Sequence, residues 1–492
     1  MANKFINHII DLLNLKENRL SIIKNTDRFF YRKDVLEELD ELKFRIVFGS
    51  ALELRIDFEL NYKRNLDHNF LYLIDNREDL LEDMRSEGCY YDFQLISYFP
   101  EYSPDTIQNY SLYELYLLYF NKPTQTLTES QTAAYLRRSI SIENSNKDSI
   151  KLRLLSDLKT ITSLAEVNWE NVILPVSKVM LSAIKAELWE DIKPEIENLN
   201  ERFQQYLQEN FKSHIIPSSS AKRPRIVSNV LPYLNLNFKT KDKIALIVID
   251  GMSYWQYLML SSHFGDEVEA SNEVIYSWIP SITQLSRQAI FRGLKPQSSY
   301  KQDPTNEANL WYTFWRQKGL LDAQIRYDNN SLQDKNLNNI LRLALVDIYL
   351  DEKMHASSDY NDLYDLTQNW IENTGILPAI HRLLSEDFEI FLTTDHGNIK
   401  AKSLSNIGPK EKLGTNKSGS RSLRHLEYSD NWLKEQFLAN HPDWLPFLGQ
   451  DKNTIYIKND LAFSSDDSLV THGGSHFLEV LIPFIRLKKV NK

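Results

Sequence analysis

The sequence predicts an α/β protein, in which a mostly helical N-terminal region with a few strands is followed by an α/β sandwich. The strongest observations are two near-continuous apolar runs, KIALIVI at 243–249 and FEIFLTT at 388–394. Runs of this kind are typical of parallel strands that are buried on both faces. Helical patterns lie between them, at 253–262, 284–293, 336–350 and 361–385. Strands that alternate with helices predict a parallel sheet covered on both faces.

The first two hundred residues show mainly helical periodicity. Apolar residues recur at helical spacing from the start of the chain, at Ile9, Ile10, Leu12, Leu13 and Leu20. Further helices are expected at 31–42, 111–120, 130–140 and from about 176 to 212. Short apolar runs interrupt this pattern and predict strands at 44–48, 70–74 and 93–98.

A segment rich in proline, serine and basic residues, IIPSSSAKRPR at 215–225, breaks the pattern and predicts a linker. The expected organisation is an N-terminal region over 1–214, a linker over 215–239 and a C-terminal domain over 240–492. A chain of 492 residues has room for roughly two to four domains. We interpret the basic cluster as a solvated connection in preference to a nucleic-acid patch.

Composition restricts the class of protein further. With 42% hydrophobic residues the chain can bury large cores, and its net charge of −10 argues against a surface that binds nucleic acid throughout. The single cysteine, Cys89, excludes an internal disulfide and a cysteine zinc site, and it fits a reducing compartment. No apolar run approaches the roughly 20 residues of a membrane span. We therefore expect a cytoplasmic protein without membrane attachment.

Acidic residues follow both of the strongest predicted strands, as Asp250-Gly251 and as Asp395-His396-Gly397. Open α/β sheets form their sites at the carboxyl ends of their strands. Glycine directly after such a residue permits a sharp turn and a close backbone approach to a ligand. Asp250 alone is equally compatible with a helix N-cap, whereas the Asp395-His396 pair favours a ligand site.

A hydroxyl group lies near the predicted start of a helix in IPSITQLSRQAIFRG at 279–293. Free N–H groups and the helix dipole favour anion binding at such a position, where a hydroxyl can attack phosphorus. Ser281 and Thr283 are both candidates, although a lone Ser or Thr is more often an N-cap. Arg287 follows Thr283 by one turn on the same face, so it is expected to reach the phosphoryl group.

Two further segments carry residue types that bind metals. In DIYLDEKMH at 347–355, Asp347, Asp351 and His355 are spaced by four, so on a helix they share a face. An Asp and a His at this spacing can form half of a zinc site, although a solvated acidic face is the alternative. His472 precedes two glycines and another apolar run. Together, the segments supply the carboxylates, imidazoles and hydroxyl that two metals with a shared nucleophile require.

The same segments resemble the alkaline phosphatase superfamily, and within it the PglZ domains of BREX phage-defence systems. The matching strings are VIDGM (248–252), PSITQLSRQAIFRGLKP (280–296), TTDHG (393–397) and HGGSHFLEVLIPFI (472–485). They extend over most of 240–492. The resemblance implies an alkaline-phosphatase-like α/β/α sandwich with a two-zinc hydrolase site.

The resemblance also implies a role for each candidate residue. Asp351, His355 and His472 would hold one Zn²⁺, while Asp250, Asp395 and His396 would hold the other. Thr283 would bridge them as nucleophile, and only the resemblance prefers it to Ser281. Asp347 remains a competitor of Asp351, Mn²⁺ is the alternative to Zn²⁺, and His476 stands where the family pattern has no ligand.

The implied activity is hydrolysis of phosphodiesters, with nucleotides, cyclic nucleotides or oligonucleotides as substrates. The glycine- and lysine-rich stretch at 400–425 is expected to form a loop over the phosphate pocket. Other proteins of an anti-phage defence system are the expected partners, and the oligomeric state is left open, a homodimer included. The alternatives are a phosphomonoesterase and a non-enzymatic scaffold of a defence complex with structural metals. A sulfatase is set aside because no C/S-x-P-x-R string surrounds Thr283.

Overall fold

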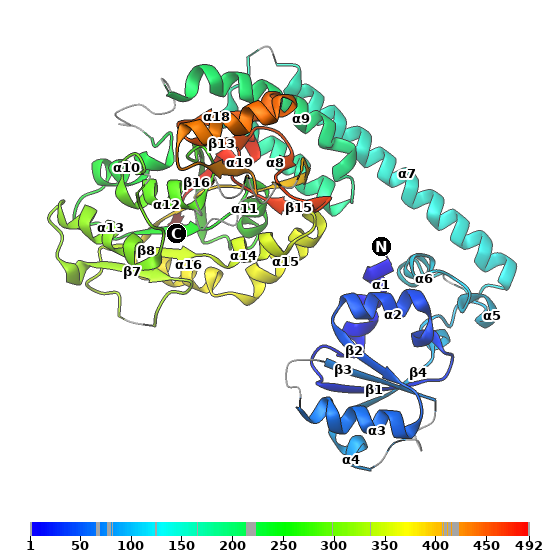
Figure 1. Cartoon of the computed structure of the whole chain (residues 1–492). Coiled ribbons are helices and arrows are strands. Elements are labelled where there is room, and N and C mark those ends of the chain that lie inside the picture. The colour runs from blue at the N-terminus through cyan, green and yellow to red at the C-terminus, as the bar shows by residue number, and fades with distance from the viewer. Residues whose placement is uncertain are drawn as a thin grey trace. The chain divides into compact units, whose positions relative to one another are not determined.

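The computed structural model describes residues 2–64, 69–75, 80, 82–123, 125–164, 166–212, 223–297, 299–334, 336–405, 407, 411, 415 and 423–490. The chain divides into two compact units, Met1–Ser149 and Ile150–Lys492 (Figure 1). The boundary falls inside one long helix, α7 (Glu129–Thr162). Among the described residues, no helix has both the length and the apolar character needed to cross a membrane.

The first unit is built on a parallel sheet in the order β2-β3-β1-β4. Its strands are β1 (Leu20–Asn25), β2 (Phe44–Phe48), β3 (Asn69–Ile74) and β4 (Cys89–Phe93). Its helices besides the start of α7 are α1 (Ala2–Leu12), α2 (Lys33–Glu41), α3 (Ala51–Leu60), α4 (Glu82–Glu87), α5 (Pro104–Ile107) and α6 (Leu112–Phe120). Successive side chains of β1 enter different cores, Ile22 on the face of α3 and α4, and Ile23 on the face of α1, α2 and α6.

The strands expected at 44–48 and 70–74 are confirmed as β2 and β3. The strand expected at 93–98 is wrong, because β4 ends at Phe93 and Leu95–Tyr98 is a 3-10 helix. The pattern also missed β1, whose first residue, Leu20, was counted in a helical series. Both errors concern short apolar runs, for which strand and helix cannot be separated by periodicity alone.

The second unit is built on a six-stranded sheet in the order β6-β16-β9-β5-β8-β7. Its strands are β5 (Ile244–Ile249), β6 (Val268–Tyr276), β7 (Ile325–Asn329), β8 (Arg342–Asp347), β9 (Glu389–Thr393) and β16 (Leu481–Lys489). Strands β7, β8, β5 and β9 are parallel, and β16 runs antiparallel to β9 and β6. Every residue of β5 and β8 is buried, as expected for central strands covered on both faces.

Helices cover the sheet and small strands extend the unit. The helices are α8 (Trp169–Lys185), α9 (Trp189–Asn210), α10 (Val230–Asn237), α11 (Tyr254–Ser261), α12 (Thr283–Arg292), α13 (Pro304–Arg316), α14 (Tyr349–Ala356), α15 (Tyr360–Asn373), α16 (Ile376–Ser385), α18 (Asn431–Asn440) and α19 (Phe477–Val480). Two three-stranded sheets are formed by β10 (Ile399–Ser403), β14 (Leu461–Ala462) and β15 (Ser468–Thr471), and by β11 (His425–Glu427), β12 (Leu448–Asp451) and β13 (Thr454–Ile457).

The strands expected at 243–249 and 388–394 and the helices expected at 253–262 and 284–293 are confirmed as β5, β9, α11 and α12. The helix expected at 336–350 is wrong, because this stretch contains β8. Its run LALV fits a buried strand as well as a helix. The helix expected at 361–385 is two helices, α15 and α16, which separate at Thr374 and Gly375.

Residues 223–239, expected to be part of a linker, contribute to the core of the second unit. Val230, Leu231 and Leu234 of α10 are fully buried, in one cluster with β5, α8 and α9. The stretch expected as one helix from 176 to 212 is α8 and α9, separated at Glu187, whose φ is +57°. Residues 213–222 lie outside the described part of the chain. The compact unit therefore begins well before the expected boundary at 240.

The register of the sheet positions three acidic residues. Asp250 follows β5, Asp347 ends β8 and Asp395 comes two residues after the end of β9. Because these strands are parallel neighbours, their carboxyl ends meet at one edge of the sheet.

Candidate active site

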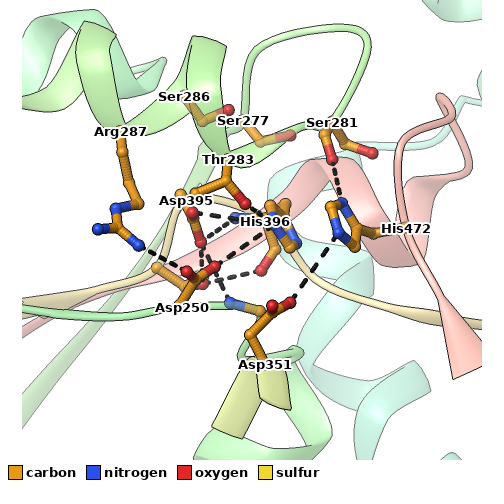
Figure 2. Close-up of polar contacts among 12 residues, drawn as sticks. Asp250, Ser277, Ser281, Thr283, Ser286, Arg287, Asp351, Asp395, His396 and His472 are labelled. Atoms are coloured by element: carbon orange, nitrogen blue, oxygen red, sulfur yellow. Dashed lines mark hydrogen bonds and ion pairs between the residues drawn. The ribbon is translucent and has the colours of Figure 1, made fainter. Parts of the chain in front are cut away.

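Six predicted site residues gather at this edge, with Arg287 beside them (Figure 2). Asp250, Asp395 and His396 come from the strand ends, Thr283 is the first residue of α12, Asp351 lies on α14 and His472 follows β15. His355, one turn after Asp351 on α14, completes the set. Segments more than two hundred residues apart in the sequence therefore build one site.

Asp351, His355 and His472 can hold a cation together, because each offers one ligand atom and these atoms all lie within 4.8 Å of one another. The Oδ1 atom of Asp351 is 3.5 Å from His355 Nε2 and 3.9 Å from His472 Nε2. The Nδ1 atom of His472 donates to the carbonyl of Ser281 (2.9 Å), since a carbonyl only accepts. In the neutral ring the lone pair of His472 is then on Nε2, the nitrogen that faces Asp351.

A second group adjoins the first and consists of Asp250, Asp351 and His396, again with ligand atoms within 4.8 Å. Nε2 of His396 is 3.6 Å from Asp250 Oδ1 and 3.8 Å from Asp395 Oδ2. Nδ1 of His396 donates to the carbonyl of Gly397 (2.9 Å), which leaves Nε2 free of a proton. The rings of His396 and His472 are stacked with centroids 3.8 Å apart, and Asp351 belongs to both groups, so the two candidate metal groups are direct neighbours.

The hydroxyl of Thr283 lies at this cluster. Its Oγ1 is 3.1 Å from Nε2 of His396, to which it donates. Thr283 begins α12, and the N-cap residue Ile282 offers no side-chain cap, so the first N–H groups of the helix are not capped from that position. A helix start of this kind favours an anion next to the hydroxyl.

Ser281, the competing hydroxyl, is engaged elsewhere. Its Oγ donates to Glu479 Oε1 (3.2 Å) and accepts from the N–H of Gly473 (3.0 Å). Glu479 is fully buried, pairs with the fully buried Arg424 (3.0 Å) and accepts from the N–H of Gly474 (3.0 Å). Ser281 therefore supports the segment that carries His472.

Asp347 also has other partners. Its Oδ1 accepts from the N–H of Tyr349 (2.9 Å) and its Oδ2 from the indole N–H of Trp370 (3.3 Å). Burial raises the pKa of Asp347 to about 6. Between the two competitors, Asp351 is the one that faces His355 and His472.

Arg287 forms a buried network with Asp250 and Glu307. Its Nη1 donates to Asp250 Oδ2 (2.5 Å), while Nε and Nη2 donate to the two carboxylate oxygens of Glu307 (2.6 and 2.9 Å). The hydroxyl of Tyr327 also donates to Glu307 (2.6 Å). Burial lowers the pKa of Arg287, but Glu307 and Asp250 outweigh it and raise the pKa well above its ordinary value. Arg287 thus contacts a candidate ligand, and its contact with the phosphoryl group stays a prediction.

Sequence reasoning missed Glu307. It is fully buried in α13, whose sequence PTNEANLWYTFWR is otherwise apolar on the same face, at Trp311 and Trp315. The available signal was a glutamate one turn before Trp311 and two turns before Trp315, on the apolar face of the helix. Because a carboxylate is seldom buried unless it is paired, such a glutamate predicts a cationic partner. His476 accepts the N–H of Leu478 at Nδ1 and caps α19, and its Nε2 lies 3.3 Å from Glu197 Oε1. The absence of a ligand role for His476, which the resemblance implies, stays a prediction.

Electrostatics favour uncharged side chains in this cluster. Burial, followed by the nearby Asp395, raises the pKa of Asp250 to about 7, and burial also raises the pKa of Asp395. Burial lowers the pKa of His396 and His472, and for His472 the neighbouring His396 and His355 lower it further. Cations in the cluster would reverse this preference for the carboxylates.

The residues fit two divalent cations. Asp250 Oδ1 and Asp395 Oδ2 are buried and have no hydrogen-bond partner within the described part of the chain. Carboxylate oxygens and unprotonated imidazole nitrogens are the ligands that zinc and manganese accept. Of the loop expected over the phosphate pocket, residues 406, 408–410, 412–414 and 416–422 lie outside the described residues.

This chain is similar to one protein family and to several solved structures. The family model of the BREX system PglZ alkaline phosphatase-like domain matches residues 229–487, more than half of the chain. Among solved structures, phosphonoacetate hydrolase from Sinorhizobium meliloti 1021 is 12% identical, with 50% of this chain and 90% of that chain covered and a TM-score of 0.34. Murine ectonucleotide pyrophosphatase/phosphodiesterase 5 is 12% identical, with 50% and 88% covered and a TM-score of 0.34. No curated protein sequence matches this chain.

Proposed function

This chain belongs to the PglZ family of BREX-system alkaline phosphatase-like domains, and we propose that it hydrolyses phosphodiesters of nucleotides or oligonucleotides with Thr283 as nucleophile. One observation carries this proposal: the Thr283 hydroxyl contacts His396 at the shared face of two candidate metal groups, at the start of α12. A hydroxyl at the start of a helix and beside two cation sites is suited to attack on phosphorus.

Seven residues have roles in the proposed site. Asp351, His355 and His472 would hold one cation, and Asp250, Asp395 and His396 would hold the other, next to the Thr283 hydroxyl. Asp351 also offers a ligand atom within 4.8 Å of those of Asp250 and His396, so it adjoins both cations. Zn²⁺ is the first choice and Mn²⁺ the alternative, since both accept oxygen and nitrogen ligands. When bound, the two cations lower the pKa of the Thr283 hydroxyl and neutralise negative charge on the phosphoryl group.

The chain's own groups then carry out a double displacement. The Thr283 hydroxyl releases its proton to bulk water, its Oγ forms a bond to phosphorus as the bond to the first alcohol breaks, and that alkoxide takes a proton back from water. The α12 N–H groups orient the phosphoryl oxygens of the resulting threonyl phosphodiester. Water then attacks phosphorus, the bond to Thr283 Oγ breaks and the hydroxyl regains a proton, which releases a phosphomonoester. Arg287 acts as a positioning residue, because its guanidinium is held between Asp250 and Glu307.

The proposed setting is anti-phage defence in the cytoplasm, with other BREX proteins as partners, and it rests on the family. None of the candidate site residues lies in Met1–Ser149. We assign to this first unit a role in docking to partners. A pull-down with and without this unit tests that role, and equal capture by both forms contradicts it.

The proposed activity is tested with purified chain loaded with zinc. We expect hydrolysis of bis-p-nitrophenyl phosphate that exceeds hydrolysis of p-nitrophenyl phosphate. The reverse order identifies a phosphomonoesterase. Two metals per chain without turnover of either substrate identifies a scaffold with structural metals.

A further inference from the structure

A hollow of about 500 Å³ opens in the second unit beside the candidate active site. Its walls are the C-terminal end of α9, strands β12 and β13, and single residues from two loops. Those residues are Ile279, from the segment that leads to Thr283, and Ser475, from the segment that follows His472. The volume is in the range of small-molecule sites.

The chain itself limits how far this hollow lies from the site. Ile279 precedes Thr283 by four residues, so their Cα atoms are at most about 14 Å apart. Ser475 follows His472 by three residues, which limits that separation to about 11 Å. The two segments are joined, because the N–H of Ser281 donates to the carbonyl of Gly474 (3.1 Å). A span of about 14 Å is roughly four stacked nucleotides at 3.4 Å each.

The charge of the hollow differs from that of the whole chain. Its lining contains two lysines, Lys212 and Lys458, and no aspartate or glutamate, although the chain carries a net charge of −10. Lys212 is exposed and Lys458 is half-buried. Burial lowers the pKa of Lys458, and an anion in the hollow would stabilise its charged form. The lining therefore favours an anionic ligand.

The remaining lining suits a heterocycle with hydrogen-bonding edges. The amide side chains of Gln205, Gln208 and Gln450 are on exposed residues, and each offers both donors and an acceptor. Tyr456 and Phe211 add aromatic rings. The ring of Tyr456 covers Gly449, where a Cβ atom would approach it to 2.2 Å, so glycine permits this position of the ring. Aromatic rings with basic residues are how single-stranded nucleic acids are bound without strict sequence preference.

We propose that this hollow binds a nucleotide within about four positions of the scissile phosphodiester in a single-stranded oligonucleotide substrate. The proposal rests on the proposed function and adds to it a substrate class and a subsite. The lysines contact the flanking phosphate, the aromatic rings stack with the base, and the glutamine amides contact its edge.

The test compares Lys212→Gln, Lys458→Gln and the double variant with wild type on single-stranded DNA and RNA oligonucleotides and on bis-p-nitrophenyl phosphate. Lys178→Gln is the matched control, since it removes the same charge from an exposed position on α8. We expect the double variant to lose about tenfold in kcat/KM on oligonucleotides through a raised KM. Turnover of bis-p-nitrophenyl phosphate, which is too small to fill the hollow, stays within twofold.

Binding provides a readout that is independent of turnover. In a Thr283→Ala background, anisotropy of a labelled oligonucleotide gives the dependence of affinity on salt. Each lysine that contacts a phosphate should lower the slope of log K against log salt by about 0.7. Thermal unfolding of Lys458→Gln shows whether this variant is folded. If Lys458→Gln is unfolded, the proposal is tested with Lys212→Gln alone, because Lys212 is exposed.

Two outcomes overturn the subsite. One is a double variant that matches Lys178→Gln in both KM and salt slope. The other is an equal loss on bis-p-nitrophenyl phosphate and on oligonucleotides, which assigns the loss to the fold. A wild-type chain that hydrolyses neither substrate, but binds oligonucleotides through these lysines, supports the subsite and contradicts the proposed function.

Discussion

Arg287 donates from Nη1 to Oδ2 of Asp250 at 2.5 Å, while Oδ1 of the same carboxylate lies 3.6 Å from Nε2 of His396. One oxygen of Asp250 is thus held by a buried arginine, and the other faces the candidate metal group. Arg287 is itself held by the bidentate contact with Glu307. The orientation of Asp250, a candidate metal ligand, therefore depends on Glu307, which acts through Arg287.

Replacement of Glu307 by glutamine should weaken metal binding. The change removes the charge that compensates Arg287, so Arg287 and Asp250 lose their fixed geometry, and outer partners of this kind contribute about 10–100-fold in metal affinity. Breaking a buried ion pair also costs about 3–5 kcal/mol of stability. Metal titration followed by calorimetry measures the first effect and chemical unfolding of the metal-free chain the second. Tyr327→Phe, which removes one donor to Glu307, should have a smaller effect on metal affinity and on stability. An unchanged metal affinity in Glu307→Gln would contradict the assigned role of Arg287.

Thr283→Ala should abolish turnover of bis-p-nitrophenyl phosphate. Loss of a nucleophile reduces kcat by about 10⁴-fold or more in enzymes that form covalent intermediates. The variant should still bind metal, because the carboxylates and imidazoles remain. A kcat within tenfold of wild type would show that Thr283 is not the nucleophile.

The Ser281→Ala variant tests whether Ser281 or Thr283 supplies the nucleophilic hydroxyl. Loss of the Ser281 hydroxyl leaves the buried N–H of Gly473 without its acceptor, which costs about 1–3 kcal/mol of stability. Activity at a temperature where the variant is folded should remain within about tenfold of wild type. Thermal unfolding and kcat, measured on the same preparation, check both effects, and a complete loss of turnover in the folded variant would make Ser281 the better nucleophile.

Much of this site could be predicted from the sequence, because most ligand candidates are marked by local signals. Asp250 and Asp395 end buried apolar runs, and His472 precedes glycines and a further run. Spacing alone does not distinguish Asp351 from Asp347, since residues spaced by four share a helix face with His355, and only the family resemblance favours Asp351. The distinction depends on Trp370, which lies more than twenty residues away and occupies the carboxylate of Asp347.

The roles of Arg287 and β8 show a second limit. Helical spacing placed Arg287 on the face of Thr283, but its partner Glu307 comes from a helix whose approach only the tertiary fold determines. Similarly, the run that contains β8 is apolar on all sides because it lies between β5 and β7, and such burial removes the alternation that identifies a strand. Local patterns therefore predict strand ends well and long-range pairings poorly.

Variants of the two metal groups should differ in stoichiometry. Asp351 belongs to both groups, whereas His355 belongs to one. We expect His355→Gln to retain about one metal per chain and Asp351→Asn to lose affinity for both. Metal content after dialysis, measured by mass spectrometry, checks this, with Asp347→Asn as the control that retains two. Equal stoichiometry in His355→Gln and Asp351→Asn would contradict the sharing of Asp351.

Metal affinity should depend on pH through Asp250. Burial and Asp395 raise the pKa of Asp250 to about 7 in the metal-free chain, so below this pH a cation must displace a proton. Metal affinity therefore falls as the pH drops below 7, by about tenfold per pH unit for one displaced proton. Above pH 7 the affinity levels off, because Asp250 is already ionised. Burial lowers the pKa of His396 and His472, which reduces their competition for protons, whereas burial raises the pKa of Asp395, which adds to the dependence from Asp250. Calorimetric titration between pH 6 and 8 measures the slope of metal affinity against pH. The slope should persist in Asp347→Asn, because Asp347 lies outside both metal groups. A metal affinity that is constant over this range would mean that Asp250 is ionised before the metal binds.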